Sequence, residues 1–489
     1  MKETGKYLDW ELYQYGRGQT YPFHMPGHKR QAVTPYLTDP WKEDITEITG
    51  FDNLHHAEGI LKEAQEYAAR IFRAEQTWFL INGSTAGILA AVSACTSPGG
   101  KILMARNCHK AVYHAAYLRQ LKTVYLYPSR EMSLGLNGGI SPEDVEIALE
   151  KHRDIQAVLI TSPTYDGILS DVEKIAQAAH RYGIPLIVDE AHGAHLPFHG
   201  SFPKSALYLG GDLVIQSLHK TLPSLTQTAV IHRQSDLVSG ERLERFLGIY
   251  QTSSPSYVLM ASMTACLRYL EEEGKKAFDG YVFRLEQCRR KLRQMKNLYL
   301  PGKEIRGQGD IFDLDLSKIL ISDAGTGAEG PVLHRILREK YGLEMEMEAP
   351  GYVLALTSVM DTEEGFERLI QALEAIDSGL DQAYRTKAGI HRKIIPSFEK
   401  YPEELRPRQE MSIARAMEAE MEERDLEHSA GEISGEFAYL YPPGIPILAP
   451  GEEISREFIQ RAGLWQEQGL ELQGLSDYSL QKIKIVKRK

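Results

Sequence analysis

The sequence contains few cysteines for its length. Of 489 residues only four are cysteine, at Cys95, Cys108, Cys266 and Cys288. They are scattered, so they form neither the paired spacing of a zinc site nor the dense set of a disulfide framework. We therefore expect no metal site, reduced thiols and a cytoplasmic protein.

Long apolar runs and an excess of positive charge are also missing. No stretch of about eighteen apolar residues occurs, so no membrane span is expected, and the first residues, MKETGKYLDW, do not resemble a signal peptide. The formal net charge of -11 argues against nucleic acid as the main partner. A short basic run, Lys482–Lys489, is expected to be a terminal strand or a solvated tail.

Between residues 75 and 232 short apolar runs alternate with helical patterns. Such runs are what a sheet buried on both faces requires. Repeated strand–helix–strand order implies a mainly parallel sheet, whose ligands bind beyond the carboxyl ends of the strands. The seven predicted strands are Thr77–Ile81, Lys101–Ala105, Thr123–Tyr127, Ala157–Thr161, Leu186–Asp189, Leu213–Gln216 and Thr228–His232, with helices such as Ser84–Ser97 and Val172–Arg181 between them.

The chain is long enough for several domains. We expect an N-terminal segment, a large domain, a smaller α+β domain, a linker and a C-terminal α+β domain, over residues 1–40, 41–295, 296–380, 381–410 and 411–489. Beyond the sheet, the patterns predict helices Tyr257–Glu273 and Tyr281–Met295, strand Tyr352–Leu356, helix Glu363–Ala375 and a charged helix Met411–Glu427.

Two charged residues stand where predicted strands end. Lys220 lies in the motif SLHK, where a lysine is well placed to form an imine with an aldehyde. Asp189 closes the apolar strand PLIVD and needs a partner, because burying an unpaired carboxylate is costly. A protonated pyridine nitrogen would supply one. Taken singly, Lys220 could also be a surface lysine, and Asp189 could cap a turn or bridge to an arginine.

Two further turns have the character of binding loops. Asn82–Gly87, NGSTAG, follows a strand and opens a helix, where free N–H groups, the helix dipole and the hydroxyls of Ser84 and Thr85 favour phosphate. The alternative is an ordinary helix cap. The loop lacks the pattern of a P-loop or a dinucleotide-binding fingerprint. His109, in NCHK, could stack on a flat cofactor or cap a helix.

These motifs, in this order, resemble the Orn/Lys/Arg decarboxylases with the aspartate aminotransferase-like fold of pyridoxal-5′-phosphate (PLP) enzymes. The likeness extends over nearly the whole chain. The motifs that carry it are FHMPGHK, DITE, NGSTAG, NCHK, SPTYDG, DEAHGAH, SLHKTLPSLTQ, TSSPSY and YPPGIP, which begin at Phe23, Asp44, Asn82, Asn107, Ser162, Asp189, Ser217, Thr252 and Tyr441.

The resemblance implies a role for each matching residue. Lys220 is the imine lysine, Asp189 pairs with the pyridine nitrogen and His109 stacks on the ring. Ala191 packs on the other ring face, and His192 lies nearby. The residues implied to hold the phosphate are Ser84, Thr85, Ser217 and His219, joined by Thr252 or Ser253 of a partner subunit. The expected unit is therefore a homodimer or a higher even oligomer.

The implied reaction is α-decarboxylation of a basic L-amino acid, giving CO2 and a polyamine or its precursor. Lys220 or His219 would protonate the carbon that loses the carboxylate, and arginine is favoured over lysine and ornithine. Glu346 and Glu436 are candidates for binding the distal cation. FHMPGHK begins at Phe23, which predicts the short, Gram-positive-type form without an N-terminal wing domain.

Two alternatives remain at this stage. One is another PLP reaction on the same fold, such as transamination or elimination. Aminotransferases of this fold usually hold the substrate carboxylate with an arginine in the small domain, and Tyr352–Thr357 contains none. The other is a regulatory homologue without catalytic activity, against which the presence of both Lys220 and Asp189 argues.

Overall fold

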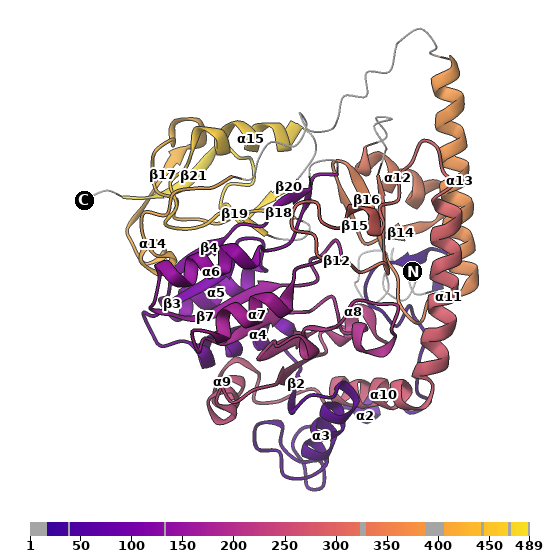
Figure 1. The fold of residues 1–489 in the computed structure, drawn as a ribbon, viewed down its shortest axis with the longest axis horizontal. Helices are drawn as coiled ribbons and strands as arrows, with labels where there is room; N and C mark the ends of the chain where they lie inside the picture. The colour runs from indigo at the N-terminus through magenta and orange to yellow at the C-terminus, as the bar shows by residue number, and fades with distance from the viewer. Residues whose placement is uncertain are drawn as a thin grey trace, which may run out of the picture.

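A computed structural model gives the structure of residues 17–37, 40–131, 134–322, 329–386, 405–441, 445–467 and 471–487. A central sheet with its helices forms the body of the molecule, and a smaller group of helices and strands lies beside it (Figure 1). The C-terminal residues, yellow in Figure 1, pack on the large domain near β4 and α5.

The central sheet has seven strands in the order β2-β11-β10-β9-β7-β3-β4. Strand β11 runs antiparallel to both of its neighbours, and the other strands are mutually parallel. The prediction of a mainly parallel seven-stranded sheet is confirmed. The strands are β2 (Gln76–Leu80), β3 (Lys101–Ala105), β4 (Lys122–Leu126), β7 (Ile155–Thr161), β9 (Leu186–Asp189), β10 (Leu213–Gln216) and β11 (Ala229–Arg233).

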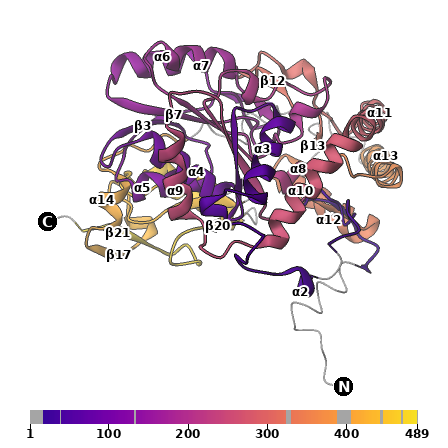
Figure 2. The same ribbon diagram turned by 90° about the horizontal axis from the view of Figure 1, so that it is seen from below.

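Successive side chains of the strands enter two different cores, as the two-residue period of a strand requires. On β3, Ile102 and Met104 join the core on one face, and Leu103 joins the core on the other. Figure 2 shows the two helix layers on opposite sides of the sheet. One layer has α4 (Gly83–Cys95), α5 (Lys110–Leu118) and α9 (Gly240–Tyr250), and the other has α3 (Ile60–Phe72), α6 (Pro142–Lys151), α7 (Val172–His180) and α10 (Tyr257–Glu272).

The smaller domain is built on the antiparallel sheet β13-β16-β15. Long helices α11 (Gly274–Leu292) and α13 (Glu363–Thr386) lie side by side against it (Figure 1). Both extend beyond the predicted bounds, since α11 begins before Tyr281 and α13 continues past Ala375. The other elements are β13 (Lys318–Ser322), α12 (Gly330–Tyr341), β14 (Leu343–Met345), β15 (Met347–Ala349) and β16 (Tyr352–Leu356).

Two short strand pairs join the small domain to earlier parts of the chain. Strand β1 (Tyr21–Phe23) runs parallel to β14, and β8 (Ile168–Leu169) runs antiparallel to β12 (Asp313–Leu314). Strand β8 follows β7 closely in the chain, so the second pair holds the small domain beside the carboxyl end of β7. Short elements elsewhere are α2 (Pro40–Glu43), η1 (Leu54–His56), β5 (Arg130–Glu131), β6 (Leu136–Asn137), η2 (Leu196–Phe198), η3 (Ala206–Tyr208), α8 (Leu218–Thr221) and η4 (Lys303–Ile305).

The C-terminal domain differs from the prediction in one element. The charged helix expected over Met411–Glu427 is wrong: only α14 (Ile413–Met417) is α-helical there, and β17 (Met421–Asp425) pairs with β21 (Lys482–Val486). Glu423 and Asp425 of β17 lie opposite lysines of β21, and Lys482 Nζ lies 2.8 Å from Glu423 Oε2. Such cross-strand pairs favour a strand over the helix that the local composition suggests. The rest of this domain is η6 (Leu426–His428), β18 (Ala438–Tyr441), β19 (Ile445–Leu448), α15 (Arg456–Glu467) and β20 (Glu471–Gln473).

The basic run at the C-terminus is therefore a terminal strand as far as Val486, and its last two residues lie outside the described part. Most of the predicted linker and residues 442–444 of YPPGIP also lie outside it. Among the described helices none combines the length and apolar character needed to cross a membrane. The same part of the chain holds no cluster of three or more His, Cys, Asp and Glu side chains suited to a metal ion.

Candidate active site

A pocket of about 320 Å³ lies beyond the carboxyl ends of the parallel strands, where ligands bind in sheets of this kind. Its walls come from the loops after β2, β3, β7, β9 and β10, and Ile445 of the C-terminal domain closes one side. The lining residues are Met25, Gly83, Ser84, Thr85, Ile88, Asn107, His109, Asn137, Thr161, Thr164, Tyr165, Asp166, Asp189, Ala191, His192, Ser217, His219, Lys220 and Ile445.

Lys220 reaches this pocket from α8, the short helix that follows β10. Its Nζ lies 2.9 Å from Nε2 of His192. Burial lowers the pKa of Lys220, while the carboxylates of Asp189 and Glu346 act in the opposite direction. A lowered pKa increases the fraction of neutral amine, which is the form that attacks a carbonyl carbon.

Asp189 is the last residue of β9 and is only 3% exposed. Its Oδ1 accepts a hydrogen bond of 3.1 Å from the Ala191 N–H. Burial raises the pKa of Asp189, and the Lys220 charge and the Ala191 N–H oppose that rise. The carboxylate thus lines the pocket with acceptor capacity left for a cationic N–H group.

Several hydrogen-bond donors lie close together where α4 begins. Ser84 Oγ and Ser217 Oγ are 2.6 Å apart, although 133 positions separate them in the chain. Gly83 has φ +71, a left-handed conformation that glycine adopts without strain. The side chain of Asn82, the N-cap residue, makes no capping hydrogen bond, so the first N–H groups of α4 remain available to an anion.

Two histidines of the pocket are held as neutral rings. His109 is the N-cap of α5, and its Nδ1 accepts the Ala111 N–H at 3.2 Å. His219 Nδ1 lies 2.9 Å from the carbonyl oxygen of Thr228, to which it must donate. Burial lowers the pKa of each to about 4, with the Lys220 charge contributing. His109 and Ala191 both line the pocket, as a cofactor sandwiched between them would require.

The family models match the parts of the chain that contain this pocket. Residues 8–315 match the Orn/Lys/Arg decarboxylase major domain, and residues 396–465 match the C-terminal domain of the same enzymes. The chain belongs to the Orn/Lys/Arg decarboxylase family. The family predicted from the motifs is confirmed, and so is the prediction that the chain is an amino-acid decarboxylase.

Curated relatives agree with this membership along most of the chain. "Arginine decarboxylase" of Bacillus anthracis is 35% identical over 97% of this chain and 96% of the relative. "Constitutive lysine decarboxylase" of Escherichia coli K12 is 26% identical over 91% of this chain and 75% of the relative. The solved lysine decarboxylase LdcF of Francisella novicida superposes with a TM-score of 0.77 at 21% identity, covering 98% of this chain and 80% of that one. This chain therefore has the same fold as that lysine decarboxylase.

The decarboxylase places most of its predicted site residues in one pocket, but not all. Thr252 and Ser253 are exposed and do not line it. The Thr252 N–H donates to Asn82 Oδ1 at 3.0 Å, which holds this segment beside the start of α4 on the outer surface. Glu436 accepts N–H groups of Ser476 and Lys484 within the C-terminal domain and lies outside the pocket lining.

Several pocket residues were not identified from the sequence as site residues. Tyr165 and Asp166 belong to the motif SPTYDG, and Met25 to FHMPGHK, so the motifs held a signal that was not used. The Tyr165 hydroxyl donates to Glu346 Oε1, and the Met25 N–H donates to Glu346 Oε2 at 2.7 Å. Glu346, a predicted cation-binding residue, therefore stands directly behind the pocket wall.

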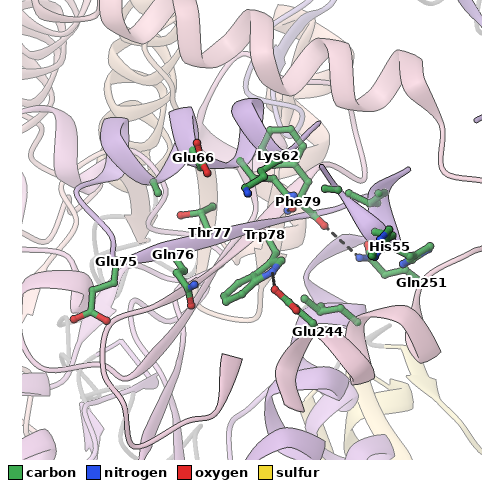
Figure 3. A pocket seen from close by; sticks show the side chains of 16 residues that line it. His55, Lys62, Glu66, Glu75, Gln76, Thr77, Trp78, Phe79, Glu244 and Gln251 are labelled. Carbon is green, nitrogen blue, oxygen red and sulfur yellow. Dashed lines mark hydrogen bonds between the residues drawn. The ribbon is translucent and has the colours of Figure 1, made fainter. Parts of the chain in front are cut away.

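Another hollow, of about 470 Å³, opens along the edge strand β2 (Figure 3). Trp78 Nε1 donates to Glu244 there at 3.1 Å, and Gln251 donates to the Phe79 carbonyl. None of the residues predicted to bind the cofactor lines this hollow. One of its residues, His55, contacts the Thr252 carbonyl at 2.7 Å, so the hollow adjoins the exposed TSSPSY segment.

Proposed function

We propose that the decarboxylase binds pyridoxal 5′-phosphate in the 320 Å³ pocket and removes the α-carboxylate of a basic L-amino acid, with arginine as the preferred substrate. The observation that carries the proposal is the convergence of Lys220 and Asp189 on one pocket, each shifting the pKa of the other. An amine and a buried carboxylate so placed match the aldehyde and the pyridine nitrogen of this cofactor.

The residues present fit each part of the cofactor. Lys220 would bind its aldehyde carbon, and Asp189, a buried carboxylate with spare acceptor capacity, would pair with the protonated ring nitrogen. His109 and Ala191 would cover the two ring faces, with His192 close by. The start of α4 would hold the phosphate together with Ser84, Thr85, Ser217 and His219.

The bound cofactor supplies an electron sink for the electron pair released as CO2 leaves. Asp189 keeps the ring nitrogen protonated and so keeps the sink strong. One proton is consumed in each turnover, because hydrogen replaces the carboxylate. Between the two predicted donors we favour Lys220 Nζ, since His219 Nδ1 already donates to Thr228 and its low pKa disfavours a second proton at Nε2.

Arginine is favoured by relatedness, because the Bacillus relatives named arginine decarboxylase align over nearly the whole chain at 32–35% identity. We propose that Glu346 attracts the distal cation. It lies behind Tyr165 and Met25, and Asp166, which is half-buried, lines the pocket beside them. No arginine occurs among the described residues that line the pocket, which favours loss of the substrate carboxylate over a transamination that retains it.

We also propose that the active unit is a homodimer in the cytoplasm. Thr252 and Ser253 are exposed beside Asn82, so a partner's copy could reach a neighbouring phosphate site. Large exposed apolar side chains occur in the adjoining segments, at Phe51, Ile60 and Ile249. Four free cysteines, three of them buried, are compatible with a reducing compartment.

The direct test is release of CO2 by the purified protein from arginine, lysine and ornithine, supplied separately with the cofactor. We expect the highest kcat/KM with arginine. Lys220→Ala should lose the visible absorbance of the bound cofactor and at least about a thousandfold in turnover. Normal turnover by that variant, or no release from any of the three amino acids, contradicts the proposal.

A further inference from the structure

His192 lies between two lysine amines. Its Nε2 is 2.9 Å from Lys220 Nζ, and its Nδ1 is 3.2 Å from Lys318 Nζ. Lys220 belongs to the large domain, and Lys318 is the first residue of β13 in the small domain. The imidazole therefore connects the predicted cofactor lysine with a buried lysine that no sequence motif pointed to.

Lys318 reaches this position because the backbone at Gly167 leaves space for its side chain. Pairing of β8 with β12 brings the small domain against SPTYDG, and the Asp315 N–H donates to the Gly167 carbonyl at 2.8 Å. Gly167 has φ +92, and a Cβ added there would lie 2.7 Å from Lys318 Cγ. Glycine at this position is thus required both by the backbone and by the path of the lysine side chain.

The protonation of His192 limits what the two amines can be. Burial holds the pKa of His192 well below its usual range, and positive charge on a neighbouring lysine adds to the effect, as do His219 and His109. A neutral imidazole has one N–H and one lone pair, and an ammonium group can only donate. The amine that faces the lone pair can be charged, but the amine that faces the N–H must be neutral.

The charges around Lys318 allow it to be the amine that keeps its proton. Burial lowers the pKa of Lys318 to about 8, while Asp315 and Glu346 oppose the shift and Lys220 and Lys29 add to it. Burial also acts on Asp315, but its pairing with His195 lowers the pKa to about 2, so it is anionic at neutral pH. Lys318 is therefore mostly ammonium below about pH 8.

We propose that Lys318 is a positioning residue whose ammonium donates to His192 Nδ1, so that His192 Nε2–H donates to Lys220 Nζ and keeps Lys220 a neutral amine. The inference rests on the proposed function of Lys220 in binding an aldehyde, because only the neutral amine is nucleophilic. It assigns a tautomer to His192 and a role in the active site to the small domain.

The test measures the pKa of Lys220 in the full-length chain freed of cofactor. The rate at which an amine-reactive acylating reagent modifies Lys220 is followed against pH by mass spectrometry of the peptide that contains it. Lys318→Met should raise the pKa of Lys220 by about one unit, as expected for loss of a charge-linked hydrogen bond. Lys318→Arg, which keeps a charged donor, should restore most of the difference. Lys303→Met, an exposed lysine of the same domain, should change nothing.

A double-mutant cycle separates action through His192 from the charge of Lys318 acting across space. In a His192→Phe background, Lys318→Met should move the pKa of Lys220 by less than half as much as in the wild type. An equal shift in both backgrounds, or no shift in the wild type, overturns the proposal.

A second measurement needs no variant at Lys318, and so remains decisive if that substitution prevents folding. In ¹⁵N-histidine-labelled wild-type protein the two ring nitrogens of His192 give distinct signals, which disappear in His192→Phe and can thus be assigned. We expect the proton on Nε2, and a proton on Nδ1 overturns the proposal. Neither the titration of Lys220 nor the ¹⁵N measurement on His192 uses an amino-acid substrate. Both outcomes would therefore stand even if the proposed decarboxylation failed.

Discussion

At the scale of single residues, the character of the active site comes from burial. Asp189, His109 and Lys220 are ordinary side chains whose protonation is shifted because water is excluded around them. All three shifts favour the neutral form: the pKa of the Lys220 amine and of the His109 imidazole falls, and the pKa of the Asp189 carboxyl rises. This is the environment that an aldehyde cofactor with a basic ring nitrogen requires.

Asp189→Asn should retain the cofactor but reduce turnover by about ten- to a hundredfold. An amide no longer stabilises the protonated ring nitrogen, and a hydrogen bond to a charged group is worth about 1.5–3 kcal/mol. Steady-state kinetics, with the cofactor content measured by absorbance, checks this. Turnover equal to the wild type at full cofactor content would remove Asp189 from the mechanism.

A buried histidine outside the pocket predicts how stability depends on pH. His232 is fully buried between Thr77 Oγ1 at 2.8 Å and Gln216 Oε1 at 3.2 Å, and burial lowers its pKa to about 3. Below its unfolded pKa near 6.5, the unfolded chain binds a proton that the folded chain does not. The free energy of unfolding should thus fall as the pH drops from about 6.5 towards 3, and His232 alone contributes ~1.4 kcal/mol per pH unit.

The check is denaturant unfolding followed over that pH range, for the wild type and for His232→Gln. The glutamine keeps polar groups near Thr77 and Gln216 but cannot titrate, so the slope of stability against pH should decrease by about one proton. An unchanged slope would mean that His232 is already protonated in the folded protein or does not titrate in the unfolded one.

At the scale of elements, the C-terminal domain is fastened to the loop that carries His109. Arg106, which follows β3 and precedes NCHK, lies 3.0 Å from Glu452 and donates to the Ile447 carbonyl at 3.0 Å. Both charged side chains are almost fully buried. The link explains how Ile445 comes to line the pocket although it lies more than 200 positions after Lys220.

Glu452→Gln should therefore destabilise the protein by about 3–5 kcal/mol, because it leaves the buried Arg106 charge without a counter-ion. Thermal or denaturant unfolding measures the loss, and we expect weaker cofactor binding with it because the His109 loop loses its anchor. Glu453→Gln is the matched control. Glu453 pairs with the exposed Arg408 at 3.0 Å, and such surface pairs contribute less than about 1 kcal/mol. Equal effects of the two substitutions would show that the buried pair has no special role.

At the scale of the whole molecule, the proposed shared site predicts how subunits assemble. A shared active site makes the interface obligatory, so it should be large, apolar and two-fold symmetric, above about 2,000 Å². The TSSPSY segment next to the start of α4 is where such a contact would have to occur. The alternative is a monomer in which this segment only caps α10, and Ser256 does accept the Leu259 N–H at 3.4 Å.

Subunit mixing distinguishes the two. Lys220→Ala and a Thr252→Ala, Ser253→Ala double variant should each be nearly inactive alone. Mixed under conditions that exchange subunits, they should regain up to about a quarter of wild-type activity, since half of the dimers are mixed and each has one intact site. Proven exchange without recovery, or full activity of a strictly monomeric form, contradicts the shared site.

The sequence by itself determined the central sheet and the residues that line its ligand edge. All seven strands were predicted within two residues of their bounds, because apolar runs and turn residues are local signals. Lys220, Asp189 and Ser84 were found because each lies at or just after the end of a predicted strand. Family motifs added roles that the pattern of apolar residues could not supply.

Tertiary structure alone decided which distant side chains meet. Lys318 and His192 are 126 positions apart, and Arg106 and Glu452 are 346 apart. No local pattern encodes such contacts, since they arise only when separately folded elements dock. The same reason explains the wrong helix at Met411–Glu427: a strand there depends on its partner Lys482–Val486, which lies about sixty residues further along the chain.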